Sequence, residues 1–214
     1  MAAAVHELIG ECHWKIRSLL RLSRYHTQSE MVQLYKSQVL SFVEYRAPGI
    51  YHACDSTLQK LNAVQDHYLK EIGIDARTAL FDYKLAPLQT RRDIAMLGLI
   101  HRTVLGKGPE HFATFFFPAT AATHRFRTRR ASRVHSRQIQ EHLSGRFLDV
   151  VKRSCLGLAS VYNILPAEIV CVNSLKCFQG RLQDLVKDQT ERHCDWPRLL
   201  SPRHWLHAHP LLRV

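Results

Sequence analysis

Apolar residues recur every three or four positions in the first third of this chain, and this spacing limits the fold more than any other feature. An α-helix returns to one face at that period, whereas a β-strand does so at every second residue. The first such run comprises Val5, Leu8, Ile9, Cys12, Ile16, Leu19 and Leu20. It predicts an amphipathic helix that buries this face, because most of the charged residues between positions 7 and 17 lie off it.

A capping signal places the next helix. Thr27 and Glu30 have the spacing of a capping box, in which the hydroxyl and the carboxylate satisfy backbone N–H groups at a helix start. The helix that follows carries apolar residues on one face up to Val43. We expect Pro48 and Gly49 to end it, because proline cannot donate an intrahelical hydrogen bond.

Further helices follow in the first half of the chain. One is capped by Asp55 or Ser56 and ends at Gly73. Glycine suits this position because the residue after a helix often adopts the left-handed conformation. A shorter helical stretch comes next. Pro87 then suits the first turn of another helix, which closes at Gly106.

The fold we predict is therefore mainly α. An N-terminal bundle of four to five helices occupies residues 1–110, and a basic irregular connector occupies residues 111–143. A small helical unit follows over residues 144–190. The tail over residues 191–214 is rich in Pro and His and is expected to be poorly ordered.

Two helices are expected in the small unit. One lies near residues 147–158. The other is capped by Asn173 or Ser174 and turns Phe178 and Leu182 inward.

The formal charge of the chain is +12, and most of the excess is arginine. The planar guanidinium group binds phosphate in a fork geometry, so a polyanion such as nucleic acid is the first hypothesis for a partner. A merely basic protein, or a chain whose acidic half lies elsewhere, would have the same composition. Because 46% of the 214 residues are hydrophobic, the chain can bury a core, and disorder throughout is not expected.

The six cysteines are scattered, and no leader of the signal-peptide type is seen. We therefore expect reduced thiols in an intracellular protein, nuclear or cytoplasmic and not secreted. No apolar run approaches the ~18 uncharged residues that a membrane span needs, so no membrane partner is expected.

The most basic stretch has no acid between Glu110 and Glu141. Its candidate contacts to nucleic acid are Arg125, Phe126, Arg127, Arg129, Arg130, Arg133 and Arg137. In an extended conformation alternate residues face one side, so three of the arginines would form a row opposite a phenylalanine ring that can stack on a base. The alternatives are a solvated, flexible loop and a nuclear-import signal.

Arg91 and Arg92 join the candidate interface because they open a helix, where the macrodipole favours acids. A compensating partner is therefore expected for them. It is either internal, from Glu44 or Asp93, or a backbone phosphate. The internal salt bridge is the safer prediction.

One segment near the end of the chain has a distinctive order of residues. It consists of Tyr162-Asn163, then Leu165-Pro166 and a short apolar run, then Ser174-Leu175 with Phe178 three positions on. This order resembles the closing segment of non-LTR retrotransposon reverse transcriptases. Weaker landmarks in the same family's order are Phe42-Val43-Glu44-Tyr45, Leu61 with Val64-Gln65, Gly73, and Leu88 with Arg91-Arg92-Asp93 and Leu97.

In that family this region is the thumb and the helical segment after it, which pack against the primer-template duplex. The resemblance implies a thumb-like fragment, a truncated product of such an element, that binds the backbone of an RNA–DNA or DNA duplex. A palm domain supplied by another chain is the further partner that it implies. The alternatives are a helical protein-interaction module and a decayed retroelement remnant without activity.

Catalysis by this chain is not expected. Polymerases of this class hold two metal ions with an adjacent pair of carboxylates, and no two carboxylates are adjacent anywhere in the sequence. Motifs of hydrolases, zinc proteases and phosphate-binding loops are also missing. We therefore expect no catalytic residue, no cofactor and no small-molecule substrate.

A zinc site is not expected either. Cys171, Cys177, His193 and Cys194 supply potential ligands. The gap of five residues between the first two does not match the tight Cys-x(2–4)-Cys knuckle of zinc sites. Both of these cysteines are expected to be small core residues.

Overall fold

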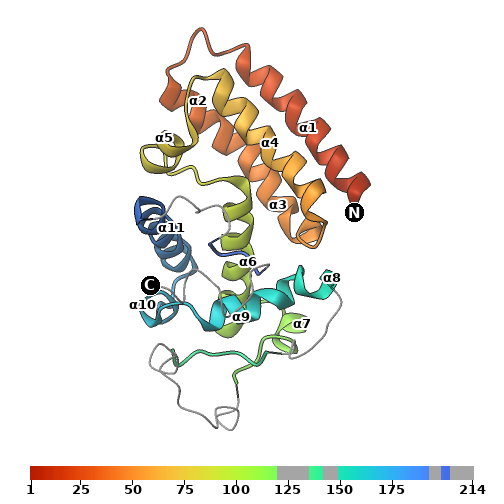
Figure 1. Ribbon diagram of the computed structural model, residues 1–214, viewed down its shortest axis with the longest axis vertical. Helices are drawn as coiled ribbons and strands as arrows, with labels where there is room; N and C mark the ends of the chain where they lie inside the picture. Colours follow the sequence, from red (N-terminus) through yellow and green to blue (C-terminus); the bar gives the residue numbers. More distant parts are fainter. Residues whose placement is uncertain (120–134, 142–148, 193–198, 203–214) are drawn as a thin grey trace. The chain divides into compact units, whose positions relative to one another are not determined.

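The computed structural model of the protein describes residues 1–119, 135–141, 149–192 and 199–202, and in these residues nearly all regular structure is helical (Figure 1). Their β-pairing is limited to one isolated antiparallel bridge, between Pro118 and Ile139. The mainly α prediction is confirmed.

Backbone contacts divide the chain into two compact units, residues 1–92 and 93–214. The division falls inside a helix, whereas the change of composition predicted a first unit up to residue 110. A run of charged residues indicates a solvent-exposed segment, and the basic run in this chain does not coincide with the boundary between the two units.

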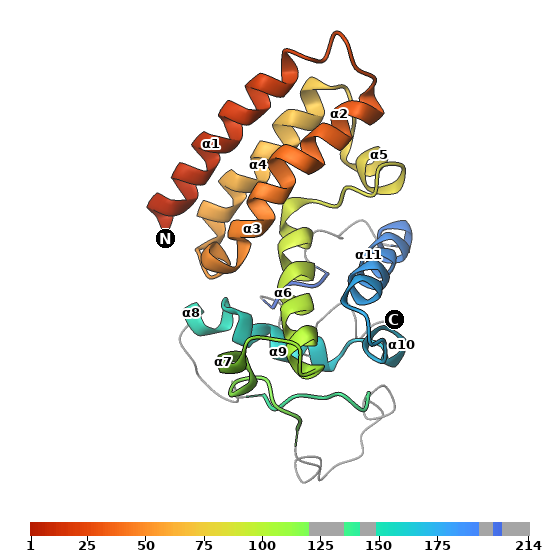
Figure 2. The ribbon, with the colours of Figure 1, turned by 180° about the vertical axis from the view of Figure 1, so that it is seen from behind.

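The first unit is built mainly from two long helices and one composite rod. Its elements are α1 (Ala2–Leu20), α2 (Gln28–Tyr35), the π-helix η1 (Lys36–Leu40), α3 (Ser41–Ile50), α4 (Asp55–Glu71), α5 (Ala76–Phe81) and the start of α6 (Leu88–Val104). The segments α2, η1 and α3 follow one another without a break, and α1 packs along α4 beside them (Figures 1 and 2). Five residues of the predicted α1 stripe are at most 6% exposed: Val5, Leu8, Cys12, Ile16 and Leu19.

Two stacked tyrosines lie in the core of this unit. The rings of Tyr35 and Tyr68 are 4.7 Å apart, and both residues are fully buried. The Tyr68 hydroxyl donates to the carbonyl of Met31 at 2.8 Å, and that of Tyr35 lies 3.4 Å from Oε1 of Gln65. Because each buried hydroxyl has a partner, the pair adds aromatic packing without an unsatisfied polar group.

The predicted capping box is confirmed. The backbone N–H of Thr27 donates to Glu30 Oε2 at 2.8 Å, and that of Glu30 donates to Thr27 Oγ1 at 3.3 Å. Gly73 has φ +72°, as expected for the residue after α4. The N-cap of α4 is Cys54, so the prediction of Asp55 or Ser56 is wrong by one or two positions. Cys54 is extended, and Asp55 is the first helical residue, where an acid suits the helix dipole.

The predicted helix end at Pro48 and Gly49 is wrong. Helix α3 runs to Ile50 with Pro48 inside it. Pro48 is two residues before the last residue of the helix, and a proline removes a single intrahelical hydrogen bond. Ala47 and Ile50 are buried, and their packing holds the last turn in place.

The second unit contains the rest of α6, then α7 (Glu110–Ala113), α8 (Asp149–Lys152), the 3₁₀ turn η4 (Cys155–Gly157), α9 (Leu158–Asn163), α10 (Ala167–Val170) and α11 (Leu175–Arg192). His101 of α6 stacks on Phe178 of α11 with ring centroids 4.0 Å apart. Phe178 and Leu182 are fully buried, as predicted, and Ser174 Oγ accepts from Cys177 N at 3.5 Å.

The helix expected near residues 147–158 is interrupted in its described part, from Asp149 onward. A side chain at Gly157 would collide with the carbonyl of Lys152, so the chain turns tightly between α8 and α9. The expected poorly ordered tail lies largely outside the described residues. Within them, 191 and 192 belong to α11, and Leu199 and Leu200 are at most 2% exposed, so the prediction does not hold there.

Candidate nucleic-acid interface

Arg91 and Arg92, two of the predicted contacts, are engaged inside the first unit. Arg91 donates from Nε to Glu44 Oε1 at 2.6 Å, which is the internal salt bridge favoured from sequence. Arg92 is only 2% exposed, and its Nη2 donates to Asn62 Oδ1 at 2.9 Å. These two guanidinium groups therefore compensate charge and polarity within the protein.

Arg137 is engaged as well, in the second unit. Its Nη1 donates to the carbonyls of Val170 and Val172 at 2.8 and 2.7 Å, and its Nη2 donates to Asn173 Oδ1 at 2.6 Å. Carbonyls at a helix end lack intrahelical partners, and a guanidinium fork satisfies them. Arg137 thus holds the backbone at and just after the C-terminal end of α10, and its role as a phosphate contact stays a prediction.

The other predicted contacts lie outside the described residues: Arg125, Phe126, Arg127, Arg129, Arg130 and Arg133. The described residues on either side of them pair with each other, since Ala119 N donates to Gln138 O at 2.9 Å and Gln140 N donates to Phe117 O at 3.0 Å. Both flanks belong to the second unit.

The Tyr162-Asn163 pair, quoted above for the family resemblance, makes several hydrogen bonds to the segment that follows the basic stretch. Asn163 makes two bonds to the backbone of Ile139, as acceptor at 3.0 Å and as donor at 2.9 Å. The Tyr162 hydroxyl lies 3.0 Å from Nδ1 of His101, and the Tyr162 carbonyl accepts from His135 Nε2 at 2.9 Å. The motif is thus a hydrogen-bonding centre that fixes the described residues on the C-terminal side of the basic stretch.

The cysteines weighed as zinc ligands are placed differently from the prediction. Cys171 and Cys177 are exposed, so their assignment to the core is wrong. Cys171 follows the last residue of the short helix α10, and Cys177 lies on the outer side of α11, away from the face that buries Phe178. Among the described residues no three His, Cys, Asp or Glu side chains are grouped as a metal site.

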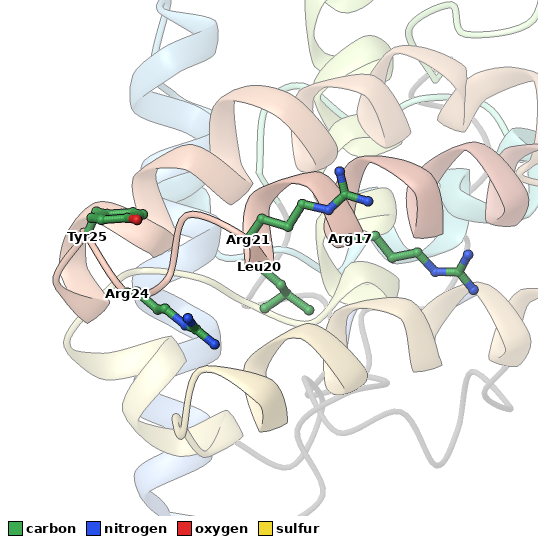
Figure 3. A pocket seen from close by; sticks show the side chains of 5 residues that line it. All are labelled: Arg17, Leu20, Arg21, Arg24 and Tyr25. Atoms are coloured by element: carbon green, nitrogen blue, oxygen red, sulfur yellow. The ribbon is translucent and has the colours of Figure 1, made fainter.

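A cluster that the sequence reasoning missed lies at the C-terminal end of α1. Arg17, Leu20, Arg21, Arg24 and Tyr25 line an open depression of about 600 Å³ (Figure 3). Arg17 and Leu20 lie in the last turn of α1, and the other three follow in the turn after it. Arg21 is the C-cap, so its positive charge faces the negative end of the helix dipole.

The three guanidinium groups of this cluster are available to a ligand. All three arginines are exposed, and none of their side chains makes a hydrogen bond or ion pair with another described residue. Two other basic residues of the first unit are engaged: Arg46 pairs with Glu11 at 3.3 Å and lies over the ring of Phe42, and Lys36 donates to the carbonyl of Tyr83. The sequence did carry a signal, since no acid occurs between Glu11 and Glu30.

The fold and this cluster define a mainly helical protein with an exposed arginine site in its first unit. Comparison with protein families, with curated proteins and with solved structures finds no match to the chain. Within the described residues, no helix is both long and apolar enough to cross a membrane.

Proposed function

We propose that the protein binds nucleic acid through its phosphate backbone and does not polymerise it. The observation that carries the proposal is the arginine site, in which Arg17, Arg21 and Arg24 surround an open depression without an internal partner. One guanidinium group can donate two parallel hydrogen bonds to a phosphate, and guanidinium groups on a surface without an acidic partner attract a polyanion. The net charge of +12 supports the same partner.

The resemblance to the thumb of non-LTR reverse transcriptases supports a place beside a primer-template duplex. In this proposal the chain is a thumb-like fragment, and a palm domain on another chain supplies any catalytic carboxylates. In the same proposal, the arginines from 125 to 133 form a second set of contacts.

The arginine site has a measurable electrostatic signature. Each neutralised phosphate contributes about −0.7 to −0.9 to the slope of log affinity against log salt, so three contacts contribute roughly −2 to −3. The arginines from 125 to 133 would make the total slope of the whole protein steeper.

The test is fluorescence anisotropy with a labelled RNA–DNA hybrid and a DNA duplex, at about 50 mM and about 200 mM salt. We expect the triple variant Arg17→Gln, Arg21→Gln, Arg24→Gln to bind at least about tenfold more weakly at the lower salt, with a flatter slope. The matched control changes three exposed basic residues of the same unit, Lys60→Gln, Lys70→Gln and Arg77→Gln.

The control should keep most of the affinity, because it loses the same charge at scattered places. Equal affinities for the wild type, the triple variant and the control would remove the arginine site from the proposal. Failure of the wild type to bind either duplex or any single strand would end the proposal itself.

A further inference from the structure

We propose that the arginine site takes an unpaired stretch of the nucleic acid, with bases stacked on exposed aromatic rings. This inference rests on the proposed function and names the form of nucleic acid that the site prefers. It comes from two large aromatic side chains beside the arginines, Trp14 and Tyr25, which are 70% and 81% exposed.

Tyr25 lies within the site itself. It lines the same depression as the three arginines, together with the partly buried Leu20 (Figure 3). The exposed phenol ring offers an apolar face for one base, while the guanidinium groups that line the same depression hold the flanking phosphates. The depression therefore combines the two kinds of contact that single strands use.

Trp14 extends this surface along α1. It precedes Arg17 by three residues and Arg21 by seven, so the three side chains share one stripe of the helix. At about 1.5 Å per residue, Trp14 and Arg21 are about 10 Å apart along the axis. The stripe thus carries one aromatic and two cationic side chains, and Arg17 and Arg21 also line the depression.

The exposure of these rings distinguishes single strands from duplexes. In a duplex each base is already stacked between neighbours and shows only its edges in the grooves, so a surface ring has no base face to contact. An unpaired base has a free face, and stacking on an aromatic ring tolerates every base. The arginines serve either form, but the rings add affinity only for unpaired bases.

The test compares a labelled single strand of about 12 nucleotides, as DNA and as RNA, with a duplex of the same sequence. We expect Tyr25→Ala to weaken single-strand binding about 5- to 100-fold and to change duplex binding less than about twofold. Trp14→Ala should also weaken single-strand binding, and Tyr25→Phe, which keeps the ring, should bind the single strand like the wild type. Tyr45→Ala is the matched control, because Tyr45 is 86% exposed but lies on α3.

The outcomes separate this inference from the proposed function. One outcome would overturn the preference for unpaired bases and leave the proposed function standing. In it, the arginine triple variant loses binding, while Tyr25→Ala and Trp14→Ala either weaken binding of single strand and duplex equally or weaken neither. Displacement of the strand by an equal nucleotide concentration of a mononucleotide would also overturn it, because a pocket for one nucleotide would then account for the binding. Melting curves by circular dichroism check that each variant is folded.

Discussion

Arg91 and Glu44 form an ion pair that joins the first turn of α6 to α3. The Arg91 Nε donates to Glu44 Oε1 at 2.6 Å, and Nη2 lies 2.5 Å from the same oxygen. The two side chains are 20% and 30% exposed, so the pair is partly withdrawn from solvent. An arginine at a helix start opposes the macrodipole, and Glu44 supplies the compensating charge. The pair therefore contributes to the stability of the first unit.

We expect Arg91→Gln to lower the free energy of unfolding by about 1 to 2 kcal/mol, because it breaks a charge-assisted, partly screened pair. Glu44→Gln should cost a similar amount, and the double variant less than both together. Urea denaturation followed by circular dichroism measures each value. Arg17→Gln is the matched control and should stay within about 0.5 kcal/mol of the wild type. Normal stability with weaker nucleic-acid binding in Arg91→Gln would return this residue to the interface.

A second prediction concerns two glycines with opposite roles. Gly73 has φ +72°, so Gly73→Ala should destabilise the protein by about 1 kcal/mol through backbone strain. Gly49 lies inside α3, where an added methyl group meets no other atom within 4 Å. Gly49→Ala should therefore stabilise by about 0.5 to 1 kcal/mol. Thermal melting of both variants tests the signs, and a shift of the same sign in both would contradict the assignment.

Local signals in the sequence predicted most of the helices of the first unit. The apolar stripe of α1 and the capping box at Thr27 each depend on residues within one or two turns, so both were visible in the chain. One continuous helix after Thr27 was also predicted, but its π-helical turn over Lys36–Leu40 and its last turn past Pro48 were not. The last turn of α3 depends on the packing of Ala47 and Ile50, which are buried on either side of the proline.

The contacts of the candidate binding arginines were likewise predictable where they depend on local sequence and not where they depend on the fold. The partner of Arg91 was predictable because a positive charge at a helix start requires one. The partners of Arg137 are carbonyls 33 and 35 positions away, which only the folded chain brings together. The arginine site at the end of α1 was visible in the sequence as a stretch without acids. That its guanidinium groups have no ion-pair partner among the described residues is a property of the folded first unit.

The thiol of Cys54 should be unusually reactive. It is exposed at the start of α4, and hydrogen bonds with the hydroxyls of Ser56, at 3.4 Å, and Thr57, at 2.9 Å, lower its pKa to about 7. The thiolate is the reactive form, so the rate of alkylation by iodoacetamide should reach half its maximum near pH 7. Peptide mass spectrometry at a series of pH values measures this rate for Cys54 alone.

Thr57→Val keeps the shape of the side chain but removes one hydroxyl, so it should move the pH profile of Cys54 alkylation upward. Ser23→Ala removes an exposed hydroxyl from the turn after α1 and is the matched control. Identical profiles for the wild type and Thr57→Val would show that the hydroxyl does not stabilise the thiolate.

The second unit contains two buried histidines, and the hydrogen bonds of one of them, His135, require a neutral ring. Nε2 of His135 donates to the carbonyl of Tyr162, so Nδ1 accepts from the backbone N–H of Arg137 at 3.2 Å. Nε2 of His101 donates to the carbonyl of Val172 at 2.9 Å, and Nδ1 faces the Tyr162 hydroxyl. A second proton on His135 would therefore meet another N–H donor. Burial lowers the pKa of both rings, and the positive charge of Arg137 lowers it further.

Acid should consequently destabilise the second unit. In the unfolded chain both rings titrate near pH 6.5, and in the folded chain they titrate lower, so the unfolded state binds more protons below pH 6.5. The contribution of the neutral rings is complete above that pH and is lost as the pH falls toward the folded pKa values. Urea denaturation at about pH 7.5 and about pH 5.5 should show this loss in the wild type and in His6→Gln, a control for an exposed ring. His135→Gln should be less stable at the higher pH and should depend less on pH, whereas equal pH dependence in all three proteins would show that His135 is not the titrating group.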